Sequence, residues 1–120
     1  MKSYRDLEVY QRSYKLAVEI HNFSMKLPKE LSWDLGDQIR RASRSIPSNI
    51  AEGYGRSKSW RDIVNFLNDA LGSNHEMLFN LEFMKDVGLI KEHDYKYYVD
   101  QYTICGKQLF TLIKVIKTSN

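Results

Sequence analysis

The sequence predicts an all-α protein, an up-down-up-down antiparallel four-helix bundle that forms a single domain over residues 1–120. Two prolines and six glycines leave few breaks in the chain. Apolar residues recur at intervals of three and four positions, which is the spacing of one buried helix face, and no alternating β-branched run is long enough to indicate a strand. Short connections at 28–31, 56–58 and 89–91 would make consecutive helices antiparallel neighbours.

The first helix is expected from about Asp6 to about Lys26. Leu27 and Pro28 end it, because a proline disfavours the helical conformation of the residue before it. Its apolar stripe consists of Val9, Tyr10, Ser13, Leu16, Ala17, Ile20, Phe23 and Leu27.

The second helix is expected from near Ser32 or Trp33 to around Gly55, and it passes through Pro47. A proline inside a helix lacks one backbone donor and clashes with the carbonyl four residues earlier, at a cost of about 3 kcal/mol. We therefore expect a kink at Pro47, with a hydroxyl of Ser43 or Ser45 bonded to the freed carbonyl. The buried stripe consists of Leu35, Ile39, Ala42, Ile46, Ile50 and Gly53.

The third helix is expected to start at Ser59, with Asp62 completing a capping-box-like pattern, and to stop at Gly88. The fourth is expected from about Glu92 to Lys117. The third stripe consists of Trp60, Ile63, Val64, Leu67, Ala70, Leu71, Met77, Leu78, Leu81 and Met84. The fourth consists of Tyr95, Val99, Tyr102, Cys105, Leu109, Leu112, Ile113 and Ile116.

Three aromatic residues, Phe66, Phe79 and Phe83, lie off or beside the third stripe. A wide core stripe explains them, and so does a contact between subunits. A helix of about 28 residues would be roughly 42 Å long, which favours contacts beyond one core.

Basic residues concentrate in the window 40–61, although the whole chain carries a net charge of only +3. With Glu52 as its one acid, the window has a charge of +5 and the remainder of the chain −2. We predict that the basic residues of this window bind nucleic acid: Arg40, Arg41, Arg44, Arg56, Lys58 and Arg61.

The arginines at 40, 41 and 44 fall opposite the apolar stripe on a helical wheel and form one predicted outward face. Ser48 and Ala51 on that face are small enough to let a phosphate backbone approach. Alternatively the arginines only solvate the helix, with Asp34 and Asp37 as partners. Only two aromatic residues near the arginines, Tyr54 and Trp60, are candidates for base stacking. This scarcity of aromatic residues favours duplex or structured RNA over single strands as the ligand.

No arrangement of catalytic groups is present, so we predict that the protein is not an enzyme. His75 and Glu76 begin a zinc-helix pattern, but Phe79 stands where its second histidine belongs, and neither a metal site nor a cofactor is expected. Cys105 is predicted to be a buried apolar residue rather than a reactive thiol. Without a transmembrane or signal-peptide pattern, we expect a cytoplasmic protein that does not bind membranes.

The segment Ser45–Arg56, SIPSNIAEGYGR, resembles the four-helix bundle proteins encoded within intervening sequences of bacterial 23S ribosomal RNA genes. Gln38–Arg41 before it and Leu7–Gln11 at the start of the chain match as well, as do Phe66, Leu67, Ala70, Gly72 and Ser73. The resemblance covers essentially the whole chain and implies a closed homopentamer of poorly defined role. The similar accessory variability protein of diversity-generating retroelements implies basic surfaces, here Arg40, Arg41 and Arg44, that bind nucleic acid and a reverse transcriptase.

We interpret the run SIPSNIAEG mainly as a bending and packing motif formed by Ser45, Pro47, Ser48, Asn49, Glu52 and Gly53. Ser48, Ala51 and Gly55 would pack tightly, Asn49 would hydrogen-bond across the core, and Glu52 would pair with an arginine. Three functional hypotheses follow. The chain is an oligomer that binds nucleic acid or a nucleic-acid enzyme, an assembly protein whose arginines form ion pairs between subunits, or an undetected nuclease.

Overall fold

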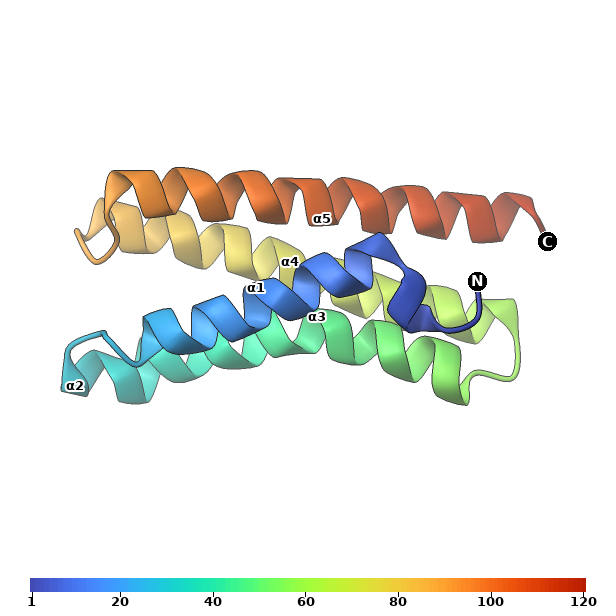
Figure 1. The fold of residues 1–120 in the computed structure, drawn as a ribbon, viewed down its shortest axis with the longest axis horizontal. Helices are drawn as coiled ribbons and strands as arrows, with labels where there is room; N and C mark the ends of the chain where they lie inside the picture. The colour runs from blue at the N-terminus through green and yellow to red at the C-terminus, as the bar shows by residue number, and fades with distance from the viewer.

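The computed structural model describes residues 1–120 and consists of four long antiparallel helices (Figure 1). These are α1 (Glu8–Ser24), α3 (Asp37–Arg56), α4 (Trp60–Asp86) and α5 (Glu92–Thr118). The helices run up, down, up and down in an elongated bundle of 47 × 22 × 20 Å. The predicted all-α fold is confirmed. None of the helices is both long enough and apolar enough to cross a membrane.

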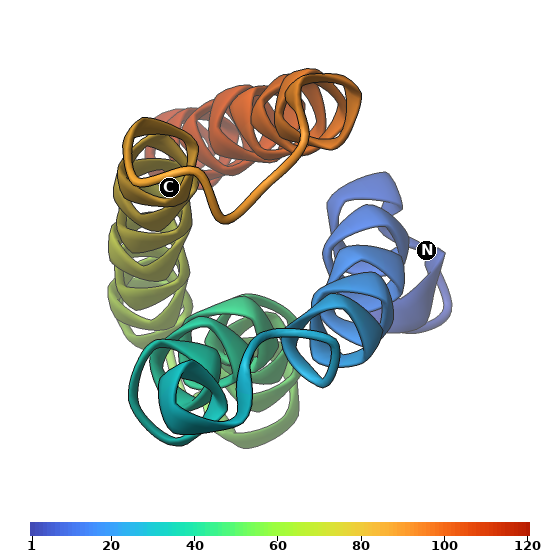
Figure 2. The same ribbon diagram turned by 90° about the vertical axis from the view of Figure 1, so that its left-hand side faces the viewer.

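The four helices form an incomplete ring in which α1 packs on α3, α3 on α4 and α4 on α5 (Figure 2). The ring is widest between α5 and α1, where polar side chains bridge the two helices. Arg12 Nη1 donates to Gln101 Oε1 at 2.6 Å, and the Tyr97 hydroxyl donates to Glu19 Oε1 at 2.9 Å. One side of α1 therefore faces α3 closely while the other meets α5 through a looser seam.

The helical path before α3 starts earlier than the sequence suggested. A short helix α2 (Lys29–Leu31) follows Pro28 directly, and a π-helical turn η2 (Ser32–Gly36) connects it to α3 without a break. Prediction of 28–31 as a connection was wrong because Pro28, which has no N–H to satisfy, is well suited to begin a helix. Its carbonyl accepts from the backbone N–H of Leu31 and of Ser32, both at 2.9 Å.

Pro47 lies buried inside α3, which continues through it and bows around its middle (Figure 1). A bend is the usual response of a helix to an internal proline. The predicted hydroxyl partner of the freed carbonyl was wrong, because the hydrogen bonds of both hydroxyls are made with other groups. Ser43 Oγ donates to the carbonyl of Arg40 at 3.1 Å, and Ser45 Oγ accepts from Asn49.

The predicted boundaries of the two longest helices are confirmed. Ser59 is the N-cap of α4, and its Oγ accepts from the N–H of Asp62 at 3.3 Å. Gly88 has a φ of 78°, the left-handed conformation that glycine adopts at the end of a helix. The chain upstream of α1 differs, because a separate 3-10 turn (Tyr4–Asp6) ends at Leu7 before the α-helix begins.

One continuous core runs along the bundle and contains the central residues of all four predicted stripes. On α4 it extends from Val64 to Met84, so the length of that helix is matched by its own core and by the equally long α5. Cys105 is fully buried as predicted, and burial raises the pKa of its thiol to about 12. Sequence periodicity missed several buried polar residues: Ser24, Ser43, Asn74 and Asn80.

Candidate nucleic-acid interface

The six predicted basic residues lie in two groups at opposite ends of α3. We call Arg40, Arg41 and Arg44 the helix group, and Arg56, Lys58 and Arg61 the turn group. Sixteen residues of helix separate the first arginine of each group, which is roughly 24 Å at the rise of an α-helix. The structure therefore does not bring the six residues together on one face.

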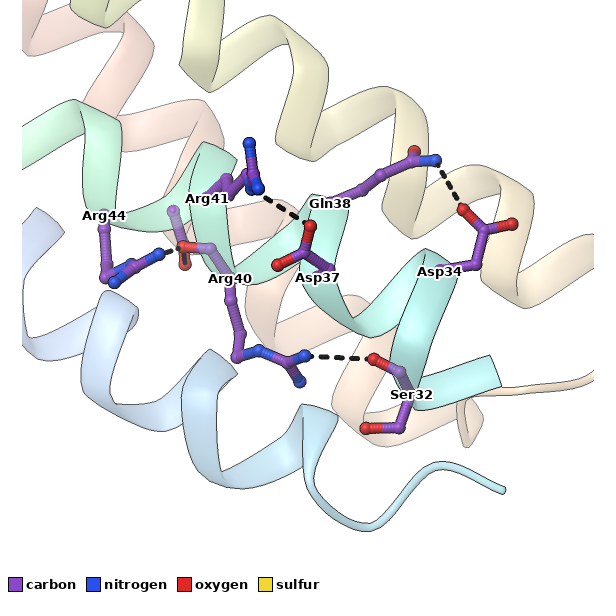
Figure 3. Close-up of polar contacts among 8 residues, drawn as sticks. Ser32, Asp34, Asp37, Gln38, Arg40, Arg41 and Arg44 are labelled. Carbon is purple, nitrogen blue, oxygen red and sulfur yellow. Dashed lines mark hydrogen bonds and ion pairs between the residues drawn. The ribbon is translucent and has the colours of Figure 1, made fainter. Parts of the chain in front are cut away.

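Arg40 does not lie on the predicted outward face. Its side chain is half-buried, and its Nη1 donates to Ser24 Oγ at 2.8 Å. Its Nη2 donates to the carbonyl of Ser32 at 3.0 Å (Figure 3). Gly36 leaves room for this guanidinium, since a Cβ there would lie 2.9 Å from Arg40 Nη1. Arg40 thus links the end of α1 to the π-helical turn, and the wheel missed this because neither partner lies on α3.

Arg41 is exposed and pairs with an acid on its own helix, as the alternative interpretation allowed. Its Nε lies 3.0 Å from Asp37 Oδ2, and both side chains remain accessible to solvent. Asp34, the other predicted partner, instead accepts from Gln38 Nε2 at 3.2 Å. An exposed pair of this kind contributes little to stability, so the guanidinium of Arg41 can exchange its partner readily.

Arg44 is the exposed arginine of the helix group that pairs with no carboxylate. Its Nε donates to the carbonyl of Arg40 at 3.2 Å, which leaves its two terminal nitrogens available (Figure 3). On one side of Arg44 lies a polar hollow of about 520 Å³ on the outside of α3. That hollow is lined by Arg41, Arg44, Ser45, Ser48, Asn49 and Glu52.

On the other side of Arg44 lies a groove of about 420 Å³ between α1 and α3, here called the α1–α3 groove. Its α1 wall is Tyr10, Tyr14, Ala17, Val18, His21 and Asn22, and its α3 wall is Arg40, Arg44, Pro47, Ser48 and Ala51. Sequence reasoning assigned Tyr10 to the core stripe and missed Tyr14, because it searched for stacking residues next to the arginines in the chain. The available signal was the four-residue spacing that places Tyr14 on the same side of the helix as Tyr10.

Within the predicted motif, Ser45 holds α3 against α4. Its Oγ accepts from Ser73 Oγ at 2.8 Å and from Asn49 Nδ2 at 2.9 Å. Asn49 also donates to the carbonyl of Ser45 at 2.9 Å, so the expectation that Asn49 bonds across the core was wrong. The link between helices comes from the two serine hydroxyls instead.

Close helix packing at a glycine occurs at Gly53, which was predicted on the buried stripe, and not at Gly55. At Gly53 a Cβ would lie 3.0 Å from the Cβ of Phe66, so this glycine permits the close approach of α3 and α4. Gly55 has no neighbour within 4 Å of such a Cβ, and Ser48 is exposed, so both expectations of tight packing were wrong.

Two members of the turn group have local partners. Arg56 Nη1 pairs with Glu52 Oε2 at 3.1 Å, which confirms the predicted pairing of that acid with an arginine. The guanidinium of Arg61 lies 4.6 Å from the centroid of the Trp60 ring. Lys58 is exposed in the connection between α3 and α4.

The three phenylalanines off the predicted stripe of α4 have different surroundings. Phe66 is half-buried against Gly53 and belongs to the packing of α3 on α4. Phe79 and Phe83 are 67% and 47% exposed, and they flank a hollow of about 530 Å³ beside the π-helical turn. The core interpretation therefore holds for Phe66 alone.

The histidines His21, His75 and His93 lie on α1, α4 and α5 respectively. No three histidine, cysteine or acidic side chains come together as metal ligands would. What the described surface offers around Arg44 is a set of cationic, hydroxyl and amide donors next to aromatic rings. Such donors bind phosphate oxygens and base edges without requiring a metal ion or a nucleophile.

Comparison with known proteins identifies a family and similar solved structures. The model of the 23S rRNA-intervening sequence protein family matches residues 5–111. A crystal structure of a protein of unknown function from the S23 ribosomal protein family of Bacteroides thetaiotaomicron is 31% identical with a TM-score of 0.81, covering 88% of this chain and 95% of that one. No protein of curated function matches the sequence significantly.

Proposed function

Since the chain belongs to the 23S rRNA-intervening sequence protein family, we propose that it is a non-enzymatic, oligomeric protein that binds RNA or DNA through the outer side of α3. The observation that carries the proposal is the exposed guanidinium of Arg44, which no carboxylate neutralises and which lies beside Ser45, Ser48 and Asn49. A cytoplasmic homopentamer would repeat this surface around a ring. A nucleic-acid enzyme such as a reverse transcriptase is a further partner of the same surface.

Arginine suits phosphate because its planar fork of N–H donors matches two phosphate oxygens, and hydroxyls and amides add weaker contacts to the same backbone. Arg44 has two terminal nitrogens free for this purpose, and Arg41 can exchange its exposed acid for a phosphate. Each phosphate neutralised releases bound counterions, which makes the affinity fall with salt concentration.

The test is the salt dependence of binding to a fluorescently labelled RNA hairpin, measured by fluorescence anisotropy. The double variant Arg41→Ala/Arg44→Ala is compared with Arg56→Ala/Lys58→Ala, which removes the same charge from the turn group. We expect the first variant to lower the slope of log K against log salt by about 2, at about 0.9 per phosphate lost, and the second to change it by less than half as much. Equal changes in both variants, or no binding by the wild type at low salt, would contradict the proposal.

The alternative, an assembly protein whose arginines pair between subunits, is favoured by Phe79 and Phe83. Large aromatic side chains exposed on a helix face opposite its core are typical of subunit contacts. Light scattering separates the two functions. If Arg41→Ala/Arg44→Ala dissociates the oligomer, the arginines serve assembly, whereas loss of RNA binding with unchanged mass supports the nucleic-acid function. The variant Phe79→Ser/Phe83→Ser tests in the same way whether the two phenylalanines hold the oligomer together. Cleavage of the RNA hairpin during the binding assay would indicate a nuclease.

A further inference from the structure

We propose that the α1–α3 groove binds an unpaired, single-stranded stretch of nucleic acid, with a base stacked on Tyr14 and an adjacent phosphate on Arg44. This inference rests on the proposed function and narrows its ligand. It replaces the preference for duplex or structured RNA that the sequence suggested, because the structure places tyrosines of α1 beside an arginine of α3.

A stacking platform is present on α1. The ring centroid of Tyr10 lies 4.9 Å from that of Tyr4 in an edge-on contact and 6.0 Å from that of Tyr14, with the latter two rings tilted by 32°. Tyr10 is thereby held between its neighbours, whereas Tyr14 ends the row and is 54% exposed. Stacking of a base on an exposed aromatic ring contributes about 1–3 kcal/mol and tolerates any base.

The groove beside this ring has an apolar floor of small side chains. Ala17 on α1 faces Pro47 and Ala51 on α3, while Val18, 49% exposed, continues the wall beyond Tyr14. These side chains leave room for a flat ring and offer few polar groups that its face would have to desolvate.

The charged side of the groove comes from Arg44, with His21 and Asn22 across from it on α1. No acidic residue lines the groove, in contrast to the polar hollow on the outside of α3, which includes Glu52. Arg40 adds positive charge but no free fork, since its guanidinium bonds to α1 and to the π-helical turn. Asn22 can bond to the edge of an unpaired base, which a duplex would keep occupied.

The exposed ring of Tyr14 together with the guanidinium of Arg44 distinguishes single strands from duplexes. Bases in a duplex stack on one another and cannot place a face on Tyr14, whereas an unpaired base in a loop or a single strand can. A groove with only hydroxyl or charged side chains would bind the backbone of either form. The exposed ring next to Arg44 is what favours the unpaired form.

Fluorescence anisotropy with labelled oligouridine, oligodeoxythymidine and an RNA duplex tests the inference and separates RNA from DNA as the source of the strand. We expect Tyr14→Ala to weaken single-strand binding about 5- to 150-fold without changing the salt slope, and to leave duplex binding unchanged. Tyr14→Phe, which keeps the ring, should bind within about twofold of the wild type. Arg44→Ala should lower the salt slope of single-strand binding by about 0.7.

Phe110→Ala is the matched control, because Phe110 is an exposed aromatic residue of α5 outside the groove and its loss should not change binding. Circular dichroism checks that each variant is folded. If single strands bind equally well with and without Tyr14, while loss of Arg41 and Arg44 still weakens binding, the inference is wrong and the proposed function stands. If no nucleic acid binds, both fail. If Tyr14→Ala changes the oligomeric mass, the groove holds a second copy of the chain and the inference is overturned.

Discussion

The helix group and the turn group each place three basic residues at one end of α3, and they differ in what surrounds them. In the turn group, Glu52 holds Arg56 and the ring of Trp60 lies under Arg61. In the helix group, Arg44 has no acidic partner and faces an aromatic groove supplied by another helix. Two of the three turn-group cations thus have local partners and Lys58 is simply exposed, whereas Arg44 combines an unpaired guanidinium with an aromatic groove.

This difference teaches that the number of charges in a sequence window is a poor guide to a binding surface. The neighbours that the fold supplies decide whether a guanidinium is free, and those neighbours come largely from other elements. Even within the helix group, Arg40 is committed to structure by partners on α1 and the π-helical turn. Replacement of Arg40 should therefore lower the stability of the fold, whereas replacement of Arg41 should not lower it much.

The largest effect on stability is expected for Arg40→Ala. It removes charge-assisted hydrogen bonds to Ser24 and to the carbonyl of Ser32 in a half-buried site, for a loss of about 1.5–3 kcal/mol in the free energy of unfolding. Arg41→Ala, which removes only an exposed ion pair, should change it by about 0.2–1 kcal/mol. Urea denaturation followed by circular dichroism measures both.

Arg40→Lys is the control for charge, because it keeps the cation but cannot reproduce the fork that contacts both elements. It should recover only part of the lost stability. Equal stability of Arg40→Ala and Arg41→Ala would remove the structural distinction between these two arginines.

The fold could be predicted from the sequence much further than the site could. Helix faces and helix caps depend on residues within one chain segment. The stripe from Leu35 to Gly53 and the cap at Ser59 could therefore be predicted. The role of Arg40 and the nearness of Tyr14 to Arg44 depend on how α1 docks on α3, which local spacing does not encode. The buried Asn74, whose Nδ2 donates to the carbonyl of Tyr102 at 2.9 Å, was missed for the same reason.

A smaller loss of stability is expected at the other end of α3, where the connection to α4 depends on a helix cap. Ser59→Ala removes the acceptor for the N–H of Asp62 and should lower the free energy of unfolding by about 1 kcal/mol. Ser57→Ala is a matched control nearby, since Ser57 Oγ is buried without a hydrogen-bond partner and its loss should not destabilise the protein. Neither variant should change RNA binding, and a loss of affinity in Ser59→Ala without unfolding would mean that the turn belongs to the interface.

A few-fold gain in affinity is expected when Arg41 is released from its acid. Asp37→Asn keeps the size of the side chain but removes the charge 3.0 Å from Arg41 Nε. Because exposed ion pairs are worth about 0.2–1 kcal/mol, RNA binding at low salt should tighten by up to about fivefold. Asp69→Asn, which removes an exposed acid on α4, controls for the change in net charge. An equal gain in both variants would show that overall charge, and not the freed arginine, governs binding.

The smallest effect is expected for Arg61→Ala in the turn group. An exposed cation–π contact contributes about 0.5–1 kcal/mol, so the loss of the guanidinium 4.6 Å from the Trp60 ring should lower the free energy of unfolding by no more than this. In a Trp33→Phe background, where Trp60 is the sole tryptophan, acrylamide should quench its fluorescence more efficiently once the guanidinium is gone. The RNA salt slope should change less than in Arg44→Ala. A larger change in slope for Arg61→Ala would reverse the ranking of the two groups, because Arg61, which contacts the Trp60 ring, would then contribute more to RNA binding than Arg44.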